Sequence, residues 1–448
     1  MNLNTLFYRY FVYYPVTILR LECPYFYFHR YLKSQYHSSC QIALEQKIRL
    51  HKLLVHAKKY TPYYQEKLPD ISSVTCLEQL PFLSKNDLRV KALDMYAPSH
   101  YLLRRWKTSG GSTGAPVTIV KSAHGMAQEL AATWRGYSWA GIKIGDKQAR
   151  FWGVPHQENA RRRARMIDLV TNRVRLSAFA FSDEELREYF DLINREKPVY
   201  FYGYVSMIRQ FAEFLQKNNL SLSFSPRCII TTSEVLLAKD KQLLEKVFSC
   251  GVFNEYGCGE VGTIAHECDQ GNLHINTENI IVEIIDDKGT VLPNGQTGEI
   301  VVTDLTNYYM PLIRYKLNDY GAISNEICGC GRRLPILTHL HGRAYDIVKN
   351  REGNKFHGEF FLYLLEDAKK EGVITQGYQV EQLALDSLNI FVVADEANFE
   401  RLIQLMLPKL KELFDQQGSY HFTRVDSIAR EASGKLRVVK GLDGGVGL

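Results

Sequence analysis

Apolar residues recur at helical spacing near the start of the chain. In segment 43–66, one face of a helix would collect Leu44, Ile48, Leu50, Leu53, Leu54 and Ala57. We predict an amphipathic helix that ends near Thr61 and Pro62, because proline disfavours the helical conformation in the residue before it. A second helix is predicted to begin within 81–88, where Ser84 stands at a position suited to an N-cap.

Further along, short apolar runs alternate with segments of helical periodicity. The strand-like runs lie at 117–120, 199–202, 228–231, 280–285 and 299–302, and the helical segments include 184–196, 205–217 and 239–248. Strands that alternate with helices predict an α/β domain built around β-sheets flanked by helices. Asp287, Lys288 and Gly289 follow the run at 280–285 and predict a hairpin turn.

The pattern changes past residue 345. Short elements follow one another at 346–349, 360–369, 378–383, 388–394 and 398–414. Their mixture of strand-like and helical segments predicts a small α+β domain. We therefore predict two domains, 1–343 and 344–448, with the boundary in the stretch 343–346.

Composition and charge limit the class of protein. A chain of 448 residues with 45% hydrophobic and 23% charged residues is long enough for more than one domain. Its net charge of +6 is too small over this length to indicate a nucleic-acid-binding protein, and it suits a polyanionic substrate. The nine cysteines are scattered rather than arranged in a dense framework, so we predict reduced thiols and a cytoplasmic location.

The N-terminal segment is rich in aromatic residues. Between Thr5 and Arg20 it also carries Arg9 and Pro15, and its uncharged run is too short to span a bilayer. We expect these aromatic residues to pack under the main domain. An interfacial helix with weak peripheral membrane association stays open as the alternative.

The strongest chemical signal is a glycine-rich stretch at 108–116. Three glycines among hydroxyl residues let the backbone approach an anion closely, so that N–H groups and hydroxyls can surround phosphate oxygens. The residues concerned are Ser109, Gly110, Gly111, Ser112, Thr113 and Gly114. The stretch lacks the Lys-[Ser/Thr] end of a Walker loop, which argues against a P-loop kinase. Taken alone, it also suits a flexible surface loop.

Two further motifs put carboxylates where a nucleotide could use them. In 254–260, Tyr256 could stack on a purine and Glu260 could hold Mg²⁺, although this motif alone is better explained as a glycine-rich turn with an exposed acid. In 310–319, Asp319 could accept hydrogen bonds from both ribose hydroxyls, but alone it is more simply a turn residue. Glycine-containing stretches at 342–346 and 433–437 complete the series.

Taken in order, these motifs resemble those of the adenylate-forming (ANL) superfamily. The order is a Gly-rich loop, Tyr-Gly-x-x-Glu, Arg-Tyr-x-x-Asp, a Gly-Arg hinge and a C-terminal Gly-Lys. Within the superfamily the chain is similar to the phenylacetate–CoA ligase branch, and to the CapK-like proteins associated with bacterial capsule and surface polysaccharide synthesis. Segments 53–66, 80–88, 260–274 and 378–382 carry this likeness, which extends over nearly the whole chain.

The resemblance implies an AMP-forming acid–thiol ligase with a large adenylation domain and a small mobile C-terminal lid. ATP and Mg²⁺ would activate a small-molecule carboxylate as an acyl-AMP, and CoA, a carrier-protein thiol or an amine would then take the acyl group. The implied roles follow position by position: Ser112, Thr113 and Gly114 hold the phosphates; Ser233, Glu234, Tyr256 and Gly257 line the adenine site; Glu260 binds Mg²⁺; Asp319 holds the ribose; Arg343 contacts the nucleotide near the hinge; and Lys435 is catalytic.

The role of Lys435 also has a physical argument. Attack of a carboxylate on an α-phosphate brings two anions together, and an ammonium placed there stabilises the transition state more than the ground state. The simpler interpretation is a surface lysine. Four positions depart from the family pattern, namely Ala115, Gly259, Asn318 and Tyr345. They leave open an alternative, a catalytically degenerate nucleotide-binding or scaffold protein of a polysaccharide assembly.

Cysteine and histidine are spaced like metal ligands in two segments. Cys268 precedes His274 by six positions, and Cys328 and Cys330 flank a single glycine. Four such ligands on two loops suit tetrahedral Zn²⁺, and a site closed by four protein ligands would be structural. The alternative is a set of buried thiols and an ordinary histidine.

The substrate pocket is poorly specified by the sequence. Aromatic residues in the segments that should form its wall are Trp134, Tyr137, Trp139, Trp152, His156, Tyr202 and Tyr204. Aromatic residues at such spacing more often belong to a core. The identity of the acid and the choice between monomer and homodimer stay open.

Overall fold

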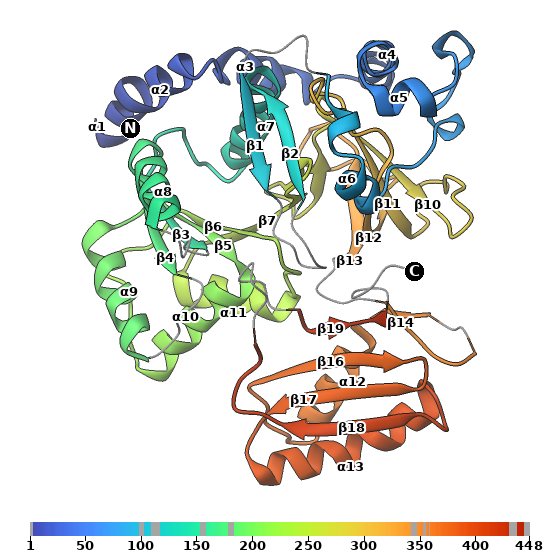
Figure 1. Ribbon diagram of the computed structural model, residues 1–448. Coiled ribbons are helices and arrows are strands. Elements are labelled where there is room, and N and C mark those ends of the chain that lie inside the picture. The colour runs from blue at the N-terminus through green and yellow to red at the C-terminus, as the bar shows by residue number, and fades with distance from the viewer. Residues whose placement is uncertain are drawn as a thin grey trace. The chain divides into compact units, whose positions relative to one another are not determined.

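The computed structural model describes residues 3–97, 103–108, 117–152, 158–177, 183–341, 347–352, 355–357, 359–429 and 437–442. These residues form two compact units (Figure 1). The first contains the described residues up to Leu340, and the second contains those from His341 onward. This division lies close to the predicted boundary at 343–346.

The first unit is built on an eleven-stranded sheet. One half of it is parallel: β4 (Arg173–Ser177), β3 (Gln148–Trp152), β5 (Tyr200–Tyr204), β6 (Cys228–Thr232) and β7 (Gly251–Cys258) lie side by side in that order. Beyond β7 the sheet continues through β8 (Gly262–Glu267), β9 (Leu273–Ile275), β13 (Ile336–His341), β12 (Tyr315–Ile323), β11 (Gly298–Asp304) and β10 (Ile280–Ile285). The predicted α/β architecture is confirmed.

Helices connect and cover the parallel strands (Figure 1). They are α7 (Ala123–Trp139), α8 (Glu158–Val170), α9 (Asp183–Glu196), α10 (Val205–Lys217) and α11 (Ala238–Phe248). The inner face of α10 buries Met207, Ile208, Phe211 and Leu215, which recur at helical spacing. Phe201 of β5 and Phe248 of α11 belong to the same core cluster. The helices expected at 184–196, 205–217 and 239–248 are therefore present.

The N-terminal quarter is helical. It contains α1 (Leu3–Phe7), η1 (Tyr8–Tyr13), α2 (Tyr14–Leu19), α3 (Tyr25–Ser34), α4 (Ser39–Tyr60), α5 (Pro62–Lys67), η2 (Ile71–Ser73), η3 (Leu77–Gln79), α6 (Lys85–Val90) and η4 (Leu93–Met95). As predicted, the long helix ends at Thr61, and Pro62 begins the next one. Ser84 caps α6 in a capping box with Asp87.

The aromatic N-terminal segment divides between core and surface. Tyr13, Phe28 and Tyr31 are buried against α7 and the sheet, as expected. Phe7 and Phe11, in contrast, are exposed, so the expectation of packing is wrong for them. In the described part of the chain, no helix has the length and apolar character needed to cross a bilayer.

A two-stranded hairpin flanks the glycine-rich stretch. Its strands are β1 (Arg104–Thr108) and β2 (Thr118–Ser122), paired antiparallel, and β2 corresponds to the strand predicted at 117–120. The hairpin predicted after β10 is also present: Ile285 bridges to Val291, and Gly289 adopts a φ of 83° in the turn, which glycine tolerates.

The second unit is a small α+β domain, as predicted. A four-stranded sheet has the order β18 (Ser419–Arg424), β17 (Ser387–Val393), β16 (Gly377–Ala384) and β19 (Val439–Lys440). The helices are α12 (Glu359–Lys370) and α13 (Glu396–Leu413), and a separate hairpin pairs β14 (Ile347–Lys349) with β15 (Lys355–His357).

Candidate functional site

The carboxyl ends of the parallel strands form one edge of the large sheet. Tyr204 at the end of β5, Thr232 at the end of β6 and Glu255 on β7 are neighbours in register. Ser233 and Tyr256 follow the last two of these residues directly. Open α/β sheets bind ligands at this kind of edge, so the sheet brings Ser233 and Tyr256 to a suitable place.

Two of the predicted nucleotide residues are in direct contact. Tyr256 donates a hydrogen bond of 2.8 Å from its hydroxyl to Oδ2 of Asp319 on β12, and both side chains are buried. Asn318, which replaces the family's glycine, has a φ of 56°. Asparagine tolerates this left-handed conformation better than most residues, so the departure at 318 preserves the backbone path.

Glu260 lies buried in the turn between β7 and β8. Among the described residues, its Oε1 accepts no hydrogen bond, although the Lys85 ammonium lies 3.7 Å away. A buried carboxylate oxygen without a hydrogen-bond donor fits a cation ligand, and Mg²⁺ prefers such oxygens. Lys85, at the N-terminus of α6, was not expected in the site because it is far from Glu260 in the sequence.

Gly257 allows β7 and β8 to approach each other beside Tyr256. A Cβ atom at position 257 would lie 2.4 Å from the carbonyl oxygen of Gly262. Any other residue would therefore push the two strands apart and shift the turn that carries Glu260. The observed reason for this glycine is thus the hairpin itself, and its place near a nucleotide stays a prediction.

Ser233 and Glu234 have local roles in the fold. Ser233 adopts a φ of 67°, a strained conformation for a serine, immediately after β6. Glu234 accepts hydrogen bonds from the backbone N–H of Ser206 (2.7 Å) and from its hydroxyl (2.9 Å). The carboxylate therefore caps the positive N-terminal end of α10, and its predicted contact with adenine is untested.

A buried ionic network links the hairpin to the Glu260 turn. The Lys121 ammonium on β2 lies 2.9 Å from both Glu129 and Asp304 and donates to the carbonyl oxygen of Val261 at 2.6 Å. Lys107 on β1 also pairs with Glu129 at 2.6 Å. Burial raises the pKa of Glu129, but the two lysines outweigh it and hold that pKa at about 2. This network thus fixes β1 and β2, the strands on either side of 109–116, to the turn that carries Glu260.

Several predicted residues lie outside the described part of the chain. They are Ser109, Gly110, Gly111, Ser112, Thr113 and Gly114 of the glycine-rich stretch, Arg343 of the hinge, and Lys435. From Arg437 onward the chain is well anchored. The Arg437 carbonyl accepts a hydrogen bond of 2.7 Å from the Gln379 side chain, and β19 pairs with β16. The roles of these residues stay predictions.

A second group of buried polar residues lies under the same edge. The Tyr202 hydroxyl donates a hydrogen bond of 3.1 Å to Oε1 of Glu255. Nδ1 of His266 lies 3.8 Å from Oε2 of the same carboxyl group. Burial raises the pKa of Glu255 to about 7 and lowers that of His266 to about 3. No sequence pattern links Glu255 with His266, because only the fold brings them to Tyr202 and Tyr137.

The aromatic residues predicted for the substrate pocket do not all lie together in the fold. Trp152 stacks on Tyr202 and approaches Tyr204, at the sheet edge. Trp134 instead donates to the hydroxyl of Tyr13 in the N-terminal segment at 2.7 Å. Trp139 packs beside His274 and is part of another cluster. His156 lies outside the described residues.

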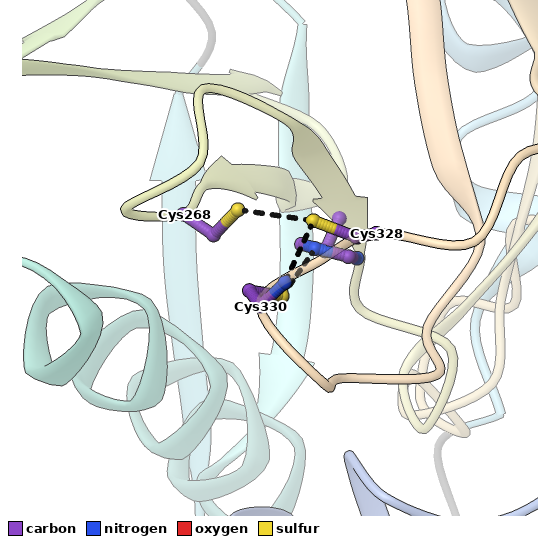
Figure 2. Close-up of side chains that lie close together, drawn as sticks. Cys268, Cys328 and Cys330 are labelled. Atoms are coloured by element: carbon purple, nitrogen blue, oxygen red, sulfur yellow. Dashed lines mark hydrogen bonds between the residues drawn. The ribbon is translucent and has the colours of Figure 1, made fainter.

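The four predicted metal ligands come together. Their ligand atoms, from Cys268, His274, Cys328 and Cys330, all lie within 4.8 Å of one another. The sulfurs of Cys268 and Cys328 are 3.6 Å apart, and Nε2 of His274 is 3.3 Å from the Cys330 sulfur. Figure 2 shows the three cysteines gathered at the ends of two loops. At usual zinc bond lengths, a tetrahedron has S···S and S···N edges of about 3.8 and 3.6 Å.

The surroundings of this cluster suit Zn²⁺ as well. Nδ1 of His274 is 2.9 Å from the Leu334 carbonyl, which assigns the ring proton to Nδ1 and leaves the Nε2 lone pair toward the sulfurs. Burial lowers the pKa of His274, so the ring is held neutral, as a metal ligand must be. Asn272 donates to the Cys328 sulfur at 3.2 Å. The residues present fit a closed Cys₃His site.

Comparison with known proteins places these features in a family. Residues 107–307 match the AMP-binding enzyme family. The chain is 25% identical to Protein CapK of Staphylococcus aureus over 88% of this chain and 87% of that protein. It is also 25% identical to the phenylacetate–coenzyme A ligase of Pseudomonas putida, over 69% of this chain and 72% of the relative. The chain carries an adenylate-forming, AMP-binding domain. Both relatives are of the kind that the sequence motifs resemble.

Solved structures agree on the fold. A 2-hydroxyisobutyryl-CoA ligase, in the postadenylation state with an acyl-AMP, superposes with a TM-score of 0.69. The two chains are 17% identical, and the match covers 91% of each. The likeness thus includes both units of the chain and is a likeness of fold.

Proposed function

We propose that this protein is an AMP-forming acid–thiol ligase. It would activate a small-molecule carboxylate with ATP as an acyl-adenylate and transfer the acyl group to CoA or to a carrier-protein thiol, or to an amine. The observation that carries the proposal is the hydrogen bond between Tyr256 and Asp319, which unites two motifs 63 positions apart at the edge where a nucleotide would bind.

In the first half-reaction, a substrate carboxylate oxygen attacks the α-phosphorus of ATP, and pyrophosphate leaves. Asp319 would accept hydrogen bonds from the ribose, and Tyr256 would hold that carboxylate in place while its ring faces adenine. The hydroxyl and glycine residues 109–114 would surround the β- and γ-phosphates. Lys435, with Arg343, would offset the charge that develops at the α-phosphate.

Two metals would support these steps. Glu260 would bind Mg²⁺, which neutralises phosphate oxygens when bound, and its Oε1 has the burial that such a role needs. Zn²⁺ bound by Cys268, His274, Cys328 and Cys330 would have a structural role, because four protein ligands leave no open position for a substrate.

In the second half-reaction, a thiol sulfur attacks the acyl carbonyl, and AMP leaves. The small second domain would turn about 343–346 so that one site serves both steps in sequence. We place the activity in the cytoplasm. From the likeness to CapK we also propose a place in the synthesis of capsule or surface polysaccharide.

The alternative is a catalytically degenerate protein that binds a nucleotide or acts as a scaffold in a polysaccharide assembly. Gly259 and Tyr345, which depart from the family pattern, favour it. The combination of Glu260, Asp319 and Lys435 favours catalysis, since binding alone would not require the lysine.

Carboxylate-dependent exchange of pyrophosphate into ATP tests the proposal. Purified protein is screened against a library of aryl, fatty and amino acids with Mg²⁺, and Lys435→Ala is the matched control. We expect exchange with at least one class of acid and its loss in the variant. Binding of ATP without exchange for any acid would support the scaffold instead.

A further inference from the structure

The N-terminal helical segment turns its large apolar side chains toward solvent. Along α1, η1 and α2, the residues Leu3, Phe7, Phe11 and Ile18 are 83%, 53%, 72% and 55% exposed. Their spacing of four, four and seven places them on one helical face. The opposite face, which contacts the protein, carries Thr5, Tyr13 and Thr17. The distribution is the reverse of that in an ordinary surface helix, whose apolar face is the buried one.

Hydrogen bonds fix this orientation. The Thr5 hydroxyl donates a hydrogen bond of 2.9 Å to Oδ1 of the buried Asp146. The Tyr13 hydroxyl accepts a hydrogen bond of 2.7 Å from the Trp134 indole. Gly145 permits the close approach, since a Cβ there would lie 2.5 Å from the Thr5 carbonyl oxygen. The segment is therefore held with its apolar side outward rather than loosely attached.

Neighbouring elements extend the exposed apolar surface. Tyr25, at the start of α3, packs its ring edge on Tyr14 with centroids 5.7 Å apart, and the next residue, Phe26, is 75% exposed. The helix α8 contacts η1 and exposes Met166 and Leu169. We call the set Leu3, Phe7, Phe11, Ile18, Leu19 and Phe26 the N-terminal apolar face.

The charges around this face are predominantly positive. Up to residue 37 the chain has four arginines and lysines (Arg9, Arg20, Arg30, Lys33) and one acid, Glu22. That acid is buried and ion-paired with both Arg20 and Arg105. The helix α8 adds four arginines against two acids, and Arg162 and Arg165 are exposed.

We infer that the N-terminal apolar face docks the protein onto the surface of an anionic lipid bilayer. The helix would lie in the plane of the interface, with its phenylalanines among the acyl chains and the arginines at the headgroups. A second copy of the chain fits less well, because a symmetric contact would bring the same arginines of the two copies together. The inference is independent of the proposed ligase activity.

Vesicle sedimentation of the full-length protein tests the inference. We expect binding to vesicles of phosphatidylcholine mixed with phosphatidylglycerol, weaker binding to phosphatidylcholine alone, and a loss of affinity at high salt. Phe7→Ser with Phe11→Ser should weaken binding about tenfold or more, given the apolar area removed. The matched control is Leu93→Ser with Ile374→Ser, two largely exposed apolar residues elsewhere, which should leave binding unchanged.

A charge variant separates the two contributions. Arg162→Gln with Arg165→Gln should reduce binding to the anionic vesicles and flatten its dependence on salt. All variants are first compared with the wild type by thermal unfolding, so that a folding defect is recognised. The inference is overturned if wild-type protein does not bind anionic vesicles, if the phenylalanine variant binds as well as wild type, or if light scattering finds a dimer that this variant disrupts while lipid binding is absent.

Discussion

Glu255 is a buried carboxyl group at the sheet edge, and burial strongly affects its pKa. It raises that pKa from 4.5 to about 7, and the hydrogen bond from Tyr202 only partly opposes the shift. The proton that Glu255 keeps near neutral pH therefore belongs to the folded state. An unfolded chain would lose it at a lower pH.

This shift predicts a pH dependence of stability. Between pH 4.5 and 7 the folded carboxyl binds a proton that the unfolded one does not, so the unfolding free energy falls as the pH rises through this window. Glu255→Gln cannot titrate. Relative to wild type it should therefore gain stability from pH 4.5 to pH 7, by on the order of 3 kcal/mol.

Urea unfolding of both proteins at a series of pH values measures this difference. His266 titrates in the same window with the opposite sign, but it is present in both proteins, so its contribution largely cancels. Glu184→Gln, an exposed carboxyl on α9, is the control. A difference between wild type and Glu255→Gln that stays constant with pH would contradict the assignment.

Tyr256→Phe isolates the hydroxyl that donates to Asp319. Loss of a hydrogen bond to a charged group costs about 1.5–3 kcal/mol, so the KM for ATP should rise roughly tenfold or more in pyrophosphate exchange. The KM for the acid should change little, because the hydroxyl donates to Asp319, the carboxylate that we propose holds the ribose. Tyr420→Phe, which removes a hydroxyl bonded to the Leu410 carbonyl in the second unit, should leave both constants unchanged. An equal rise in both KM values would count against the nucleotide role.

At the residue scale, the sequence reached some site residues and missed others for a physical reason. Spacing predicted that Cys268, His274, Cys328 and Cys330 come together, because cysteine and histidine close in sequence leave a local pattern. Lys85 and Lys121 leave none, since Glu260 and Asp304, which they approach, lie far away in the chain. Buried ion pairs of this kind depend on which strands become neighbours.

At the scale of elements, periodicity was most informative where one face is apolar. The segments 205–217 and 280–285 match α10 and β10, whose buried residues follow helical spacing or form a continuous apolar run. The strands β8 and β12 were not predicted. Each contains polar residues that are buried in the fold, such as His266 and Asp319, so their apolar pattern is interrupted.

The packing of α7 on β8 depends on one glycine. A Cβ at position 136 would lie 2.1 Å from the imidazole of His266, so Gly136→Ala forces the ring or the helix to move. We expect a loss of about 3 kcal/mol in unfolding free energy, the cost of overpacking in a core. Thermal and urea unfolding measure it.

Two further variants check the cause. Gly377→Ala, where a Cβ would make ordinary contacts at 3.7 and 3.8 Å, should cost much less. The double variant Gly136→Ala with His266→Ala should be more stable than the sum of the single effects predicts, because the clash is gone. Additive losses would show that the ring is not the obstacle.

A metal ion bound by the four ligands should cross-link two loops. Cys268 begins the turn after β8, and Cys328 and Cys330 lie in the loop before β13, so a bound ion would join segments 60 positions apart. Metal analysis should find close to one zinc per chain, and Cys328→Ser should lower the zinc content and the melting temperature together. Cys40→Ser, at an exposed cysteine outside the cluster, should change neither. Full stability in a zinc-free wild-type protein would exclude a structural role.

At the scale of the whole molecule, the change in pattern near residue 345 was enough to predict two units, because the second has its own sheet and core. The strand order β10-β11-β12-β13-β9-β8-β7-β6-β5-β3-β4 was beyond reach. In this order β13 lies between β12 and β9. No local sequence pattern predicts which of the distant strands pairs at that place. The proposed nucleotide site depends on that order, since β7 and β12 must bring Tyr256 to Asp319.

The division into two units makes the role of Lys435 separable from the rest of the site. In the sequence the lysine falls within the predicted small domain, 344–448, and it would stabilise charge only while phosphorus exchanges partners in the adenylation step. Lys435→Ala should therefore slow acyl-adenylate formation about 100-fold to 1,000-fold, as removal of comparable electrostatic contacts does. Formation of the thioester from a chemically prepared acyl-adenylate and CoA should stay close to the wild-type rate.

Rapid-quench assays of each half-reaction measure both rates, with Lys409→Ala on α13 as the control for a lysine lost from the same domain. If both half-reactions slowed equally, the lysine would serve the fold of the small domain rather than the chemistry at phosphorus.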